Sequence, residues 1–338
     1  MKLPFLANLH GTVQIGNYLD INGTDFELII VGNNYIKGYS DTAKETFDES
    51  VLLNEAITDA TGDYCIVATK NSNKIYMLNG SKKIWEDEVA GNILNVSVNK
   101  NGYSAIIYKQ AGYKSSIKVI NPEGKELFTS YLASTYAIDA KISNDNKKLA
   151  IAEIDAEGIS VQSSIKIIDI NNLRETGVSK VELLSGSLVT RIEFDNKNQL
   201  IVLTDQSALV YNGEVLNNFV ELSNEEISLA TIENSNNLIT ISRLENGIFD
   251  NNYELSVYEY KENNISEKKY EIEDVPSILV AKNKNIVMQV NGEIYVVNTN
   301  AKLIKKCKVD GNLKSIVLFN NGNVAALIFR DKIELLKI

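Results

Sequence analysis

The chain has 338 residues, 44% of them hydrophobic, so it can bury a large core. Its 44 acidic and 34 basic side chains give a formal net charge of -10, which argues against nucleic acid and anionic lipid as partners. No stretch approaches the ~18 apolar residues that span a bilayer, so the chain taken alone indicates a soluble, cytoplasmic protein.

The first 18 residues are predicted to be a linker followed by one strand. The segment MKLPFLANLHG is too short for a signal-peptide core, and its apolar run is broken by Pro4 and Asn8. The next segment, GTVQIGN from Gly11 to Asn17, has strand character around Val13 and Ile15.

A short, nearly continuous apolar strand then recurs along the chain. The copies are ELIIVGN from Glu27, YCIVATK from Tyr64, YSAIIYK from Tyr103, KLAIAEI from Lys148, QLIVLTD from Gln199, NLITISR from Asn237, NIVMQVN from Asn285 and NVAALIF from Asn323. Runs of this kind are typical of strands that are buried on both faces.

Each apolar strand is preceded by a shorter strand and a turn rich in Asn, Asp and Gly, and is followed by two more strands. The segment IYMLNGSKKIW, from Ile75 to Trp85, contains the third strand, a turn and the fourth strand of one repeat. Similar segments begin at Ile117 and at Ile294. Four strands over roughly 36 to 50 residues form the repeat of a β-propeller blade. The sequence therefore predicts an all-β, eight-bladed propeller of four-stranded antiparallel blades, with seven blades as the alternative.

The last repeat stops at Ile338, after its third strand. An open edge strand invites aggregation, so the ring must be closed. We predict that Gly11–Asn17 supplies the missing outer strand. Residues 1–18 would then be the linker and closing strand, and residues 19–338 the propeller.

The IYMLNGSKKIW phrase resembles the repeat of quinoprotein-type and WD40-like propellers, in which an Asx–Gly turn is followed by lysine and an aromatic residue. The matching residues are Asn79, Gly80, Lys83 and Trp85 in one copy, and Gly124, Lys125 and Phe128 in the next. The chain also resembles membrane-anchored propeller proteins of clostridia-type low-GC Gram-positive bacteria. That resemblance implies an extracytoplasmic propeller, held by an anchor that this chain does not contain.

The residues argue against most catalytic chemistry. Quinoprotein dehydrogenases bring tryptophan stacking and often a vicinal cysteine pair, whereas this chain has one tryptophan and two separated cysteines, Cys65 and Cys307. We expect Trp85 to pack between blades and both thiols to be buried and inert. The single histidine, His10, is expected in the N-terminal linker, away from any pocket. The chain is therefore predicted not to be an enzyme.

Carboxylates leave two alternatives open. A hydrolase or lyase could use Asp and Glu residues near the axial channel. Glu153, Asp155 and Glu157 alternate in EIDAEG and are a weak candidate for a calcium site, although they lack the length of an EF-hand loop. The expectation is that no cofactor is bound.

Partner contacts are predicted on one face, which carries the loops between second and third strands and the loops between blades. Three of these loops are long and carry apolar residues beside glycine: KQAGYKSS from Lys109, DAEGISVQSS from Asp155 and RLENGIFDNNYE from Arg243. The predicted partner-binding residues are Tyr113, Ile159, Val161, Ile248, Phe249 and Tyr253. Alternatively, these loops fold onto their own blades.

These patterns predict a monomeric, non-catalytic interaction or scaffold module that binds a protein partner. The alternatives are the carboxylate-dependent enzyme and a sensor that holds a small molecule or glycan in the channel. A glycan surface would need several exposed aromatic faces gathered together.

Overall fold

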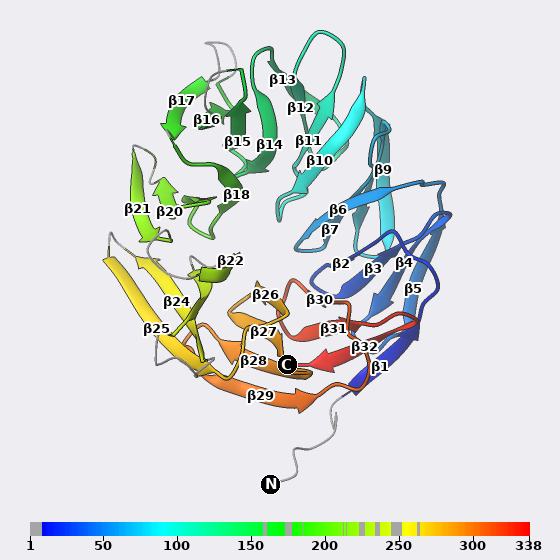
Figure 1. The fold of residues 1–338 in the computed structure, drawn as a ribbon. Helices are drawn as coiled ribbons and strands as arrows, with labels where there is room; N and C mark the ends of the chain where they lie inside the picture. The colour runs from blue at the N-terminus through cyan, green and yellow to red at the C-terminus, as the bar shows by residue number, and fades with distance from the viewer. Residues whose placement is uncertain are drawn as a thin grey trace.

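The computed structural model describes residues 9–157, 161–172, 178–184, 186–211, 213, 215–222, 227–233, 237–244, 252–261 and 264–338. Within these residues, 32 strands form eight antiparallel sheets of four strands each, and there is no helix. The sheets are arranged as blades around a central axis (Figure 1). The chain is an eight-bladed β-propeller, which confirms the predicted fold. In the described part of the chain, no helix has the length and apolar character needed to cross a membrane.

The first four blades follow the chain in order. Blade 1 contains β2 (Asp20–Gly23), β3 (Glu27–Val31), β4 (Tyr35–Ser40) and β5 (Glu45–Ser50). Blade 2 contains β6 (Ala56–Thr61), β7 (Tyr64–Thr69), β8 (Lys74–Asn79) and β9 (Lys82–Glu88). Blade 3 contains β10 (Asn92–Val98), β11 (Ser104–Lys109), β12 (Ser115–Ile120) and β13 (Glu126–Leu132). Blade 4 contains β14 (Tyr136–Ile142), β15 (Lys148–Asp155), β16 (Gln162–Asp169) and β17 (Val178–Leu184).

The other four blades complete the ring. Blade 5 contains β18 (Val189–Phe194), β19 (Leu200–Thr204), β20 (Ser207–Tyr211) and β21 (Leu216–Glu221). Blade 6 contains β22 (Ile227–Glu233), β23 (Asn237–Arg243), β24 (Tyr253–Lys261) and β25 (Asn264–Ile272). Blade 7 contains β26 (Ile278–Lys282), β27 (Asn285–Val290), β28 (Glu293–Asn298) and β29 (Leu303–Lys308). Blade 8 contains β30 (Ser315–Leu318), β31 (Val324–Ile328), β32 (Lys332–Lys337) and β1 (Leu9–Gln14).

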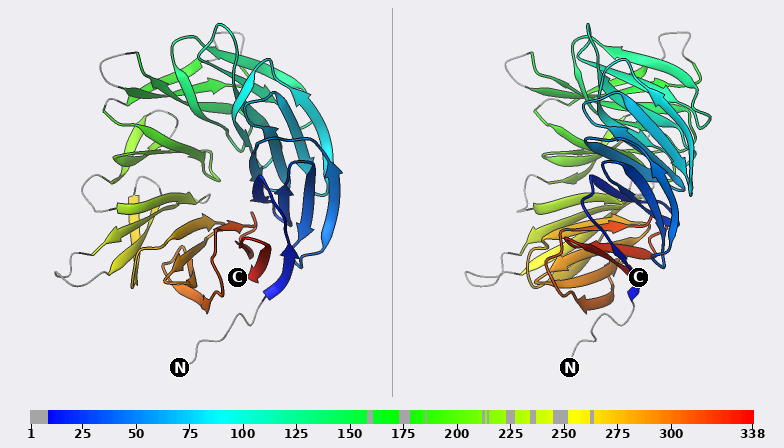
Figure 2. Two further views of the ribbon diagram at one scale, coloured as in Figure 1. Left: turned by 45° about the vertical axis from the view of Figure 1, so that its right-hand side comes forward. Right: turned by 90° about the vertical axis from the view of Figure 1, so that its right-hand side faces the viewer.

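The N-terminal strand β1 closes the ring as the outermost strand of blade 8. It pairs antiparallel with β32, so that Val13 lies opposite Ile333, and Val13 is buried. The Ile15 amide extends the pairing by donating to the Asp331 carbonyl at 3.0 Å. The predicted closure is confirmed, although the strand begins at Leu9 rather than Gly11. Figure 2 shows β1 beside the last strand of the chain from two further sides.

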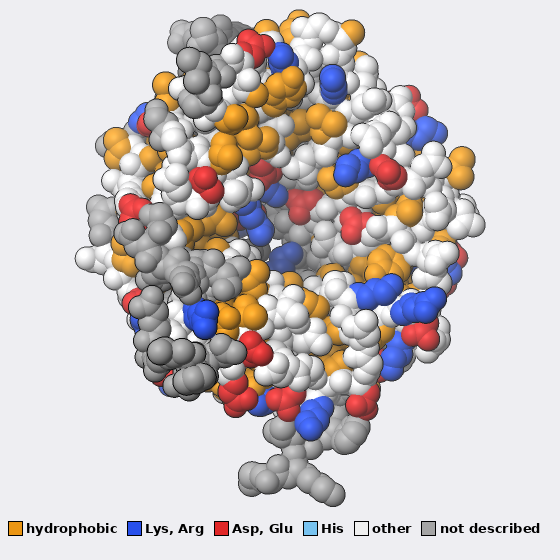
Figure 3. All heavy atoms as spheres, viewed as in Figure 1, with side chains coloured by type: hydrophobic (Ala, Val, Ile, Leu, Met, Phe, Trp, Pro, Cys, Tyr) orange, Lys and Arg blue, Asp and Glu red, His pale blue; other side chains and the backbone are white. Residues whose placement is uncertain are grey.

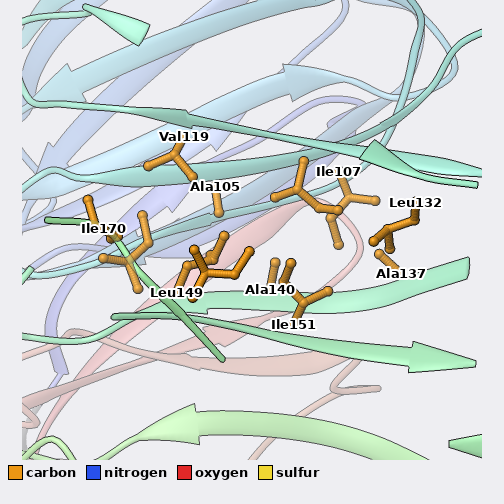
Figure 4. Close-up of a cluster of buried hydrophobic side chains, with 12 residues drawn as sticks. Ala105, Ile107, Val119, Leu132, Ala137, Ala140, Leu149, Ile151 and Ile170 are labelled. Atoms are coloured by element: carbon orange, nitrogen blue, oxygen red, sulfur yellow. The ribbon is translucent and has the colours of Figure 1, made fainter. Parts of the chain in front are cut away.

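The hydrophobic core is divided among the interfaces between neighbouring blades. One cluster joins Ala105 and Ile107 of β11 to Leu149 and Ile151 of β15 (Figure 4). Seven similar clusters fill the other interfaces. Because a neighbour covers each face of a middle strand, the second strand of each blade is apolar along nearly its whole length.

Asparagine-rich turns between first and second strands tie neighbouring blades together. The Asn99 side-chain amide, at the end of blade 3's first strand, donates to the Ser143 carbonyl of blade 4 at 2.9 Å. The Asn144 side-chain amide then donates to the Asp195 carbonyl of blade 5 at 3.0 Å. These residues therefore make bonds between blades in addition to forming the turns.

Trp85 on β9 packs between blades 2 and 3, as predicted. Its ring lies against the cluster that joins these blades, and its Nε1 donates to the Pro122 carbonyl at 3.1 Å. In the same turn, Gly124 has a φ of +81°, and a Cβ at this position would lie 2.9 Å from Cγ of Trp85. Gly124 is therefore required both by its backbone conformation and by the close approach of the indole.

We expect Gly124→Ala to destabilise the propeller more than Gly80→Ala. Gly80 is in the matching turn of blade 2 and also has a positive φ, but a Cβ there meets no atom within 4 Å. Left-handed backbone costs about 1–2 kcal/mol in either variant. Displacing Trp85 adds about 1–3 kcal/mol in Gly124→Ala alone. Urea unfolding measures both free energies, and equal losses would contradict the proposed contact.

Candidate functional site

Three exposed tyrosines gather at one end of blades 3 and 4. Tyr113 lies in the loop between β11 and β12, Tyr131 lies near the end of β13, and Tyr136 begins β14. Their exposed fractions are 39%, 51% and 38%. The rings of Tyr113 and Tyr131 are 4.7 Å apart between centroids and tilted by 31°. We call Tyr113, Tyr131 and Tyr136 the tyrosine patch.

Lys114 connects the tyrosine patch to the neighbouring blade. Its Nζ donates to the Tyr136 hydroxyl at 3.3 Å and lies 5.0 Å from the centre of that ring. The same Nζ forms an ion pair of 3.0 Å with Glu157, in the loop that follows β15. The patch is thus an aromatic surface with a charged rim, held by loops from two blades.

The residues predicted to bind a partner lie in different settings. Tyr113 belongs to the patch, and Val161 is 46% exposed just before β16. Tyr253 begins β24 and is partly buried against the cluster between blades 6 and 7. Ile159, Ile248 and Phe249 lie outside the described residues.

The sequence prediction missed Tyr131 and Tyr136. The available signal was the segment YLASTY, whose two tyrosines stand on either side of the loop between two blades. Tyrosines within strands usually pack against a neighbouring blade, so only the structure shows that these two are exposed together.

The three carboxylates of the calcium candidate have separate partners. Glu153 is buried, forms an ion pair of 2.7 Å with Lys166, and accepts a hydrogen bond of 2.6 Å from the Thr135 hydroxyl. Asp155 accepts from the Glu157 backbone amide, and the Glu157 side chain pairs with Lys114. Among the described residues, no group of three or more His, Cys, Asp or Glu side chains is placed to hold a metal ion. The expectation of no cofactor remains a prediction.

Charged side chains from the first strands meet in the axial channel. Asp59 on β6 and Lys141 on β14 belong to blades 2 and 4, which are not neighbours, so their 3.5 Å contact crosses the inside of the ring. Lys141 Nζ also lies 3.9 Å from Glu193 on β18. Lys282, on β26 of blade 7, donates from Nζ to the Ala60 carbonyl of blade 2 at 3.4 Å.

Arg191 completes this group through a 3.7 Å contact with Glu193. We call Asp59, Lys141, Arg191, Glu193 and Lys282 the axial cluster. Figure 3 shows basic and acidic side chains gathered in the hollow at the centre of the ring.

The two lysines of the axial cluster have opposite pKa shifts. Burial lowers the pKa of Lys141, but the nearby Asp59 and Glu193 outweigh it, so the pKa lies above its ordinary value. Burial also lowers the pKa of Lys282, and the charges of Arg191 and Lys141 lower it further. Asp59 and Glu193 offset only part of this effect, so the Lys282 pKa lies below its ordinary value.

Aspartates of the first strands also fasten blade 1 to blade 2 and blade 2 to blade 3. Oδ2 of Asp20 accepts from the Thr58 amide at 3.0 Å, and Oδ2 of Asp59 accepts from the Val98 amide at 3.0 Å. Burial raises the pKa of Asp20, although its hydrogen bonds with Thr58 and Ile21 act in the opposite direction. Backbone amides thus occupy part of the acceptor capacity of these carboxylates.

Sequence reasoning did not identify the axial cluster because its members come from separate repeats. A signal was present, since the apolar first strands contain isolated charges: AITDAT, YAIDAKI, VTRIEF and ILVAK. Such a charge predicts a channel-facing side chain only once the blade geometry is known.

The histidine and the two cysteines do not belong to the axial cluster. His10 is in β1, the outermost strand of blade 8, so its expected position in the linker is corrected. Cys65 and Cys307 are free and buried, as predicted. Burial raises the pKa of both thiols, which keeps them protonated.

Residues 14–338 match the model of the family described as "Family of unknown function (DUF5711)". The chain belongs to this family. No curated protein matches the DUF5711 chain by sequence.

Solved structures with 12% sequence identity resemble this DUF5711 protein over nearly their whole length. The C-terminal WD40 domain of Sif2 has a TM-score of 0.65, with 99% of each chain covered. BamB from Moraxella catarrhalis has a TM-score of 0.56, covering 97% of this chain and 98% of its own. Hydrazine synthase from Kuenenia stuttgartiensis has a TM-score of 0.54, with 99% of each chain covered. At this identity the likeness shows the propeller fold alone.

Proposed function

We propose that this DUF5711 protein is a non-catalytic interaction module that binds a protein partner through the tyrosine patch. The observation that carries the proposal is the joint exposure of Tyr113, Tyr131 and Tyr136 on the face predicted to bind partners. Tyrosine buries a large apolar area at low entropic cost and offers a hydroxyl, which is why it is enriched in interfaces and their hot spots.

The setting of the patch supports a protein partner. Lys114 and Glu157 place a charged pair beside the aromatic rings, which matches the polar rim around the apolar centre of many protein interfaces. Tyr113 and Tyr131 also hold each other in place by stacking, so less side-chain freedom is lost on binding.

We further propose that the propeller acts outside the cytoplasmic membrane of a Gram-positive bacterium, as part of an anchored protein. The resemblance to membrane-anchored clostridial propellers supports this location. Protease added to intact cells should digest the native, epitope-tagged protein. Protection from protease in intact cells, with digestion after lysis, would contradict the location.

The test of the interaction compares two surface variants. The double variant Tyr113→Ser/Tyr131→Ser removes the pair of rings in contact. The control Phe26→Ser removes a 66% exposed aromatic ring from the turn between β2 and β3 of blade 1, on the face of the propeller opposite the tyrosine patch. Protein crosslinked to the wild-type propeller in the native envelope is identified, purified and titrated against each variant. The loss of two hot-spot tyrosines should raise Kd at least about 30-fold, with Phe26→Ser unchanged. An unchanged Kd for the double variant, or no captured protein, would overturn the proposal.

A further inference from the structure

We propose that the axial channel binds a small oxyanion, a carboxylate or a phosphate, between Arg191 and Lys282. The proposal is independent of the tyrosine patch. It rests on three features of the axial cluster. Cations converge there, two of them have few hydrogen-bond acceptors, and the carboxylates already contact backbone amides or other cations.

Cationic side chains from three blades converge in the channel. Lys141 comes from blade 4, Arg191 from blade 5 and Lys282 from blade 7. Lys282 contacts the carbonyl of Ala60, which follows Asp59 in the chain. Asp59 contacts Lys141, and Glu193 lies within 4 Å of both Lys141 and Arg191. Three cations thus lie around one part of the channel, together with the carboxylates of Asp59 and Glu193.

Two of these cations have hydrogen-bond donors to spare. A lysine ammonium has three donors, and the one hydrogen bond of Lys282 in the described part of the chain is the 3.4 Å contact with the Ala60 carbonyl. Arg191 has five donors and makes a single, long ion pair of 3.7 Å with Glu193. Further from the axis, by contrast, Lys118 on β12 pairs with Asp87 on β9 at 2.6 Å. Arg191 is exposed, with 47% of its side-chain surface accessible, and Lys282 is partly exposed, so their remaining donors can reach an oxyanion in the channel.

The carboxylates of the axial cluster are already engaged, which favours an anionic ligand over a cation. Asp59 accepts from the amides of Ala60 and Val98 and contacts Lys141. Glu193 lies near both Lys141 and Arg191. The unused capacity of the site is therefore for donating hydrogen bonds, and the planar guanidinium of Arg191 suits a carboxylate or a phosphate.

The purified propeller would be titrated with sodium acetate, citrate and inorganic phosphate by calorimetry, at constant ionic strength in a buffer without other oxyanions. The variants are Lys282→Met and Arg191→Gln. The control is Lys37→Met, which removes a lysine that pairs with Glu45 and Asp48 on the outer side of blade 1. Thermal unfolding of each variant is measured in parallel.

At least one of the three oxyanions should bind the wild-type propeller. Lys282→Met and Arg191→Gln should each weaken that binding about 10-fold or more, since hydrogen bonds to charged groups contribute about 1.5–3 kcal/mol. Lys37→Met should bind as the wild type does. Because methionine removes a partly buried charge that has no close carboxylate partner among the described residues, Lys282→Met should keep or raise the Tm, which separates lost binding from lost folding.

The pattern among the anions identifies the source of the ligand. Binding of acetate or citrate alone assigns a carboxylate, and binding of phosphate alone assigns a phosphate; either supports the oxyanion site. The proposal is overturned if none of the three anions binds at millimolar concentration, or if Lys282→Met binds as tightly as Lys37→Met.

Discussion

Val13→Asp is expected to open the ring at blade 8. Val13 is 3% exposed and packs in the cluster between blades 8 and 1, so aspartate would place an unpaired carboxylate in an apolar interface. A buried, unpaired charge of this kind costs about 3–5 kcal/mol. Because β1 is held on one side only, by β32, detachment of this strand is the simplest way to relieve the cost.

Urea unfolding and size-exclusion chromatography would measure this effect. Detachment of β1 exposes the edge of β32, so the variant should also form dimers or aggregates. Gln14→Asp is the matched control, because it adds the same charge to the next residue, which is exposed and lies opposite Lys332. Equal stability of the two variants would show that β1 does not close the ring.

The second large effect is expected from Lys166→Met, which removes the cation that neutralises Glu153. Glu153 is 3% exposed, and its nearest charge is the Lys166 ammonium at 2.7 Å. The Thr135 hydroxyl would remain as its hydrogen-bond donor. Removing one partner of a buried ion pair leaves an uncompensated charge, so the free energy of unfolding should fall by about 3–5 kcal/mol.

A double variant separates the unpaired charge from the change in packing. In Lys166→Met/Glu153→Leu both charges are absent, and apolar replacements of buried pairs are often close to neutral. This variant should therefore recover much of the stability lost in Lys166→Met, as measured by the urea midpoint. If Lys166→Met alone is as stable as the wild type, Glu153 does not depend on the ion pair.

The fold was predictable because its signals are local. Each blade repeats an apolar strand, an Asn-rich turn and a more alternating strand within one short segment. The closure followed from a missing fourth strand and from the apolar Val13 and Ile15. The start of β1 was not predictable, because Leu9 and His10 show no strand alternation. Leu9 pairs with Leu336 of β32, and His10 lies at a register shift between Leu9 and Gly11.

The functional surfaces were only partly predictable, for a physical reason. Tyr113 stands out because it occupies a long loop, whereas Tyr131 and Tyr136 are in strands, where tyrosine is ordinarily a packing residue. The axial cluster is assembled by the ring itself. Asp59 and Lys282 come from blades 2 and 7, and no local pattern indicates that they share one channel.

The pairing of β1 with β32 also sets the mechanical behaviour of the molecule. Leu9 lies opposite Leu336 at one end of the β1–β32 pair, and Gln14 lies opposite Lys332 at the other end. A force that pulls the two ends of the propeller apart therefore acts first on the end of the pair that contains Leu9 and Leu336. The load would reach the hydrogen bonds one after another, as in unzipping, rather than all at once in shear. Under tension, blade 8 is therefore the joint that yields first, and the other seven blades, whose four strands are consecutive in the chain, are loaded only after it has opened.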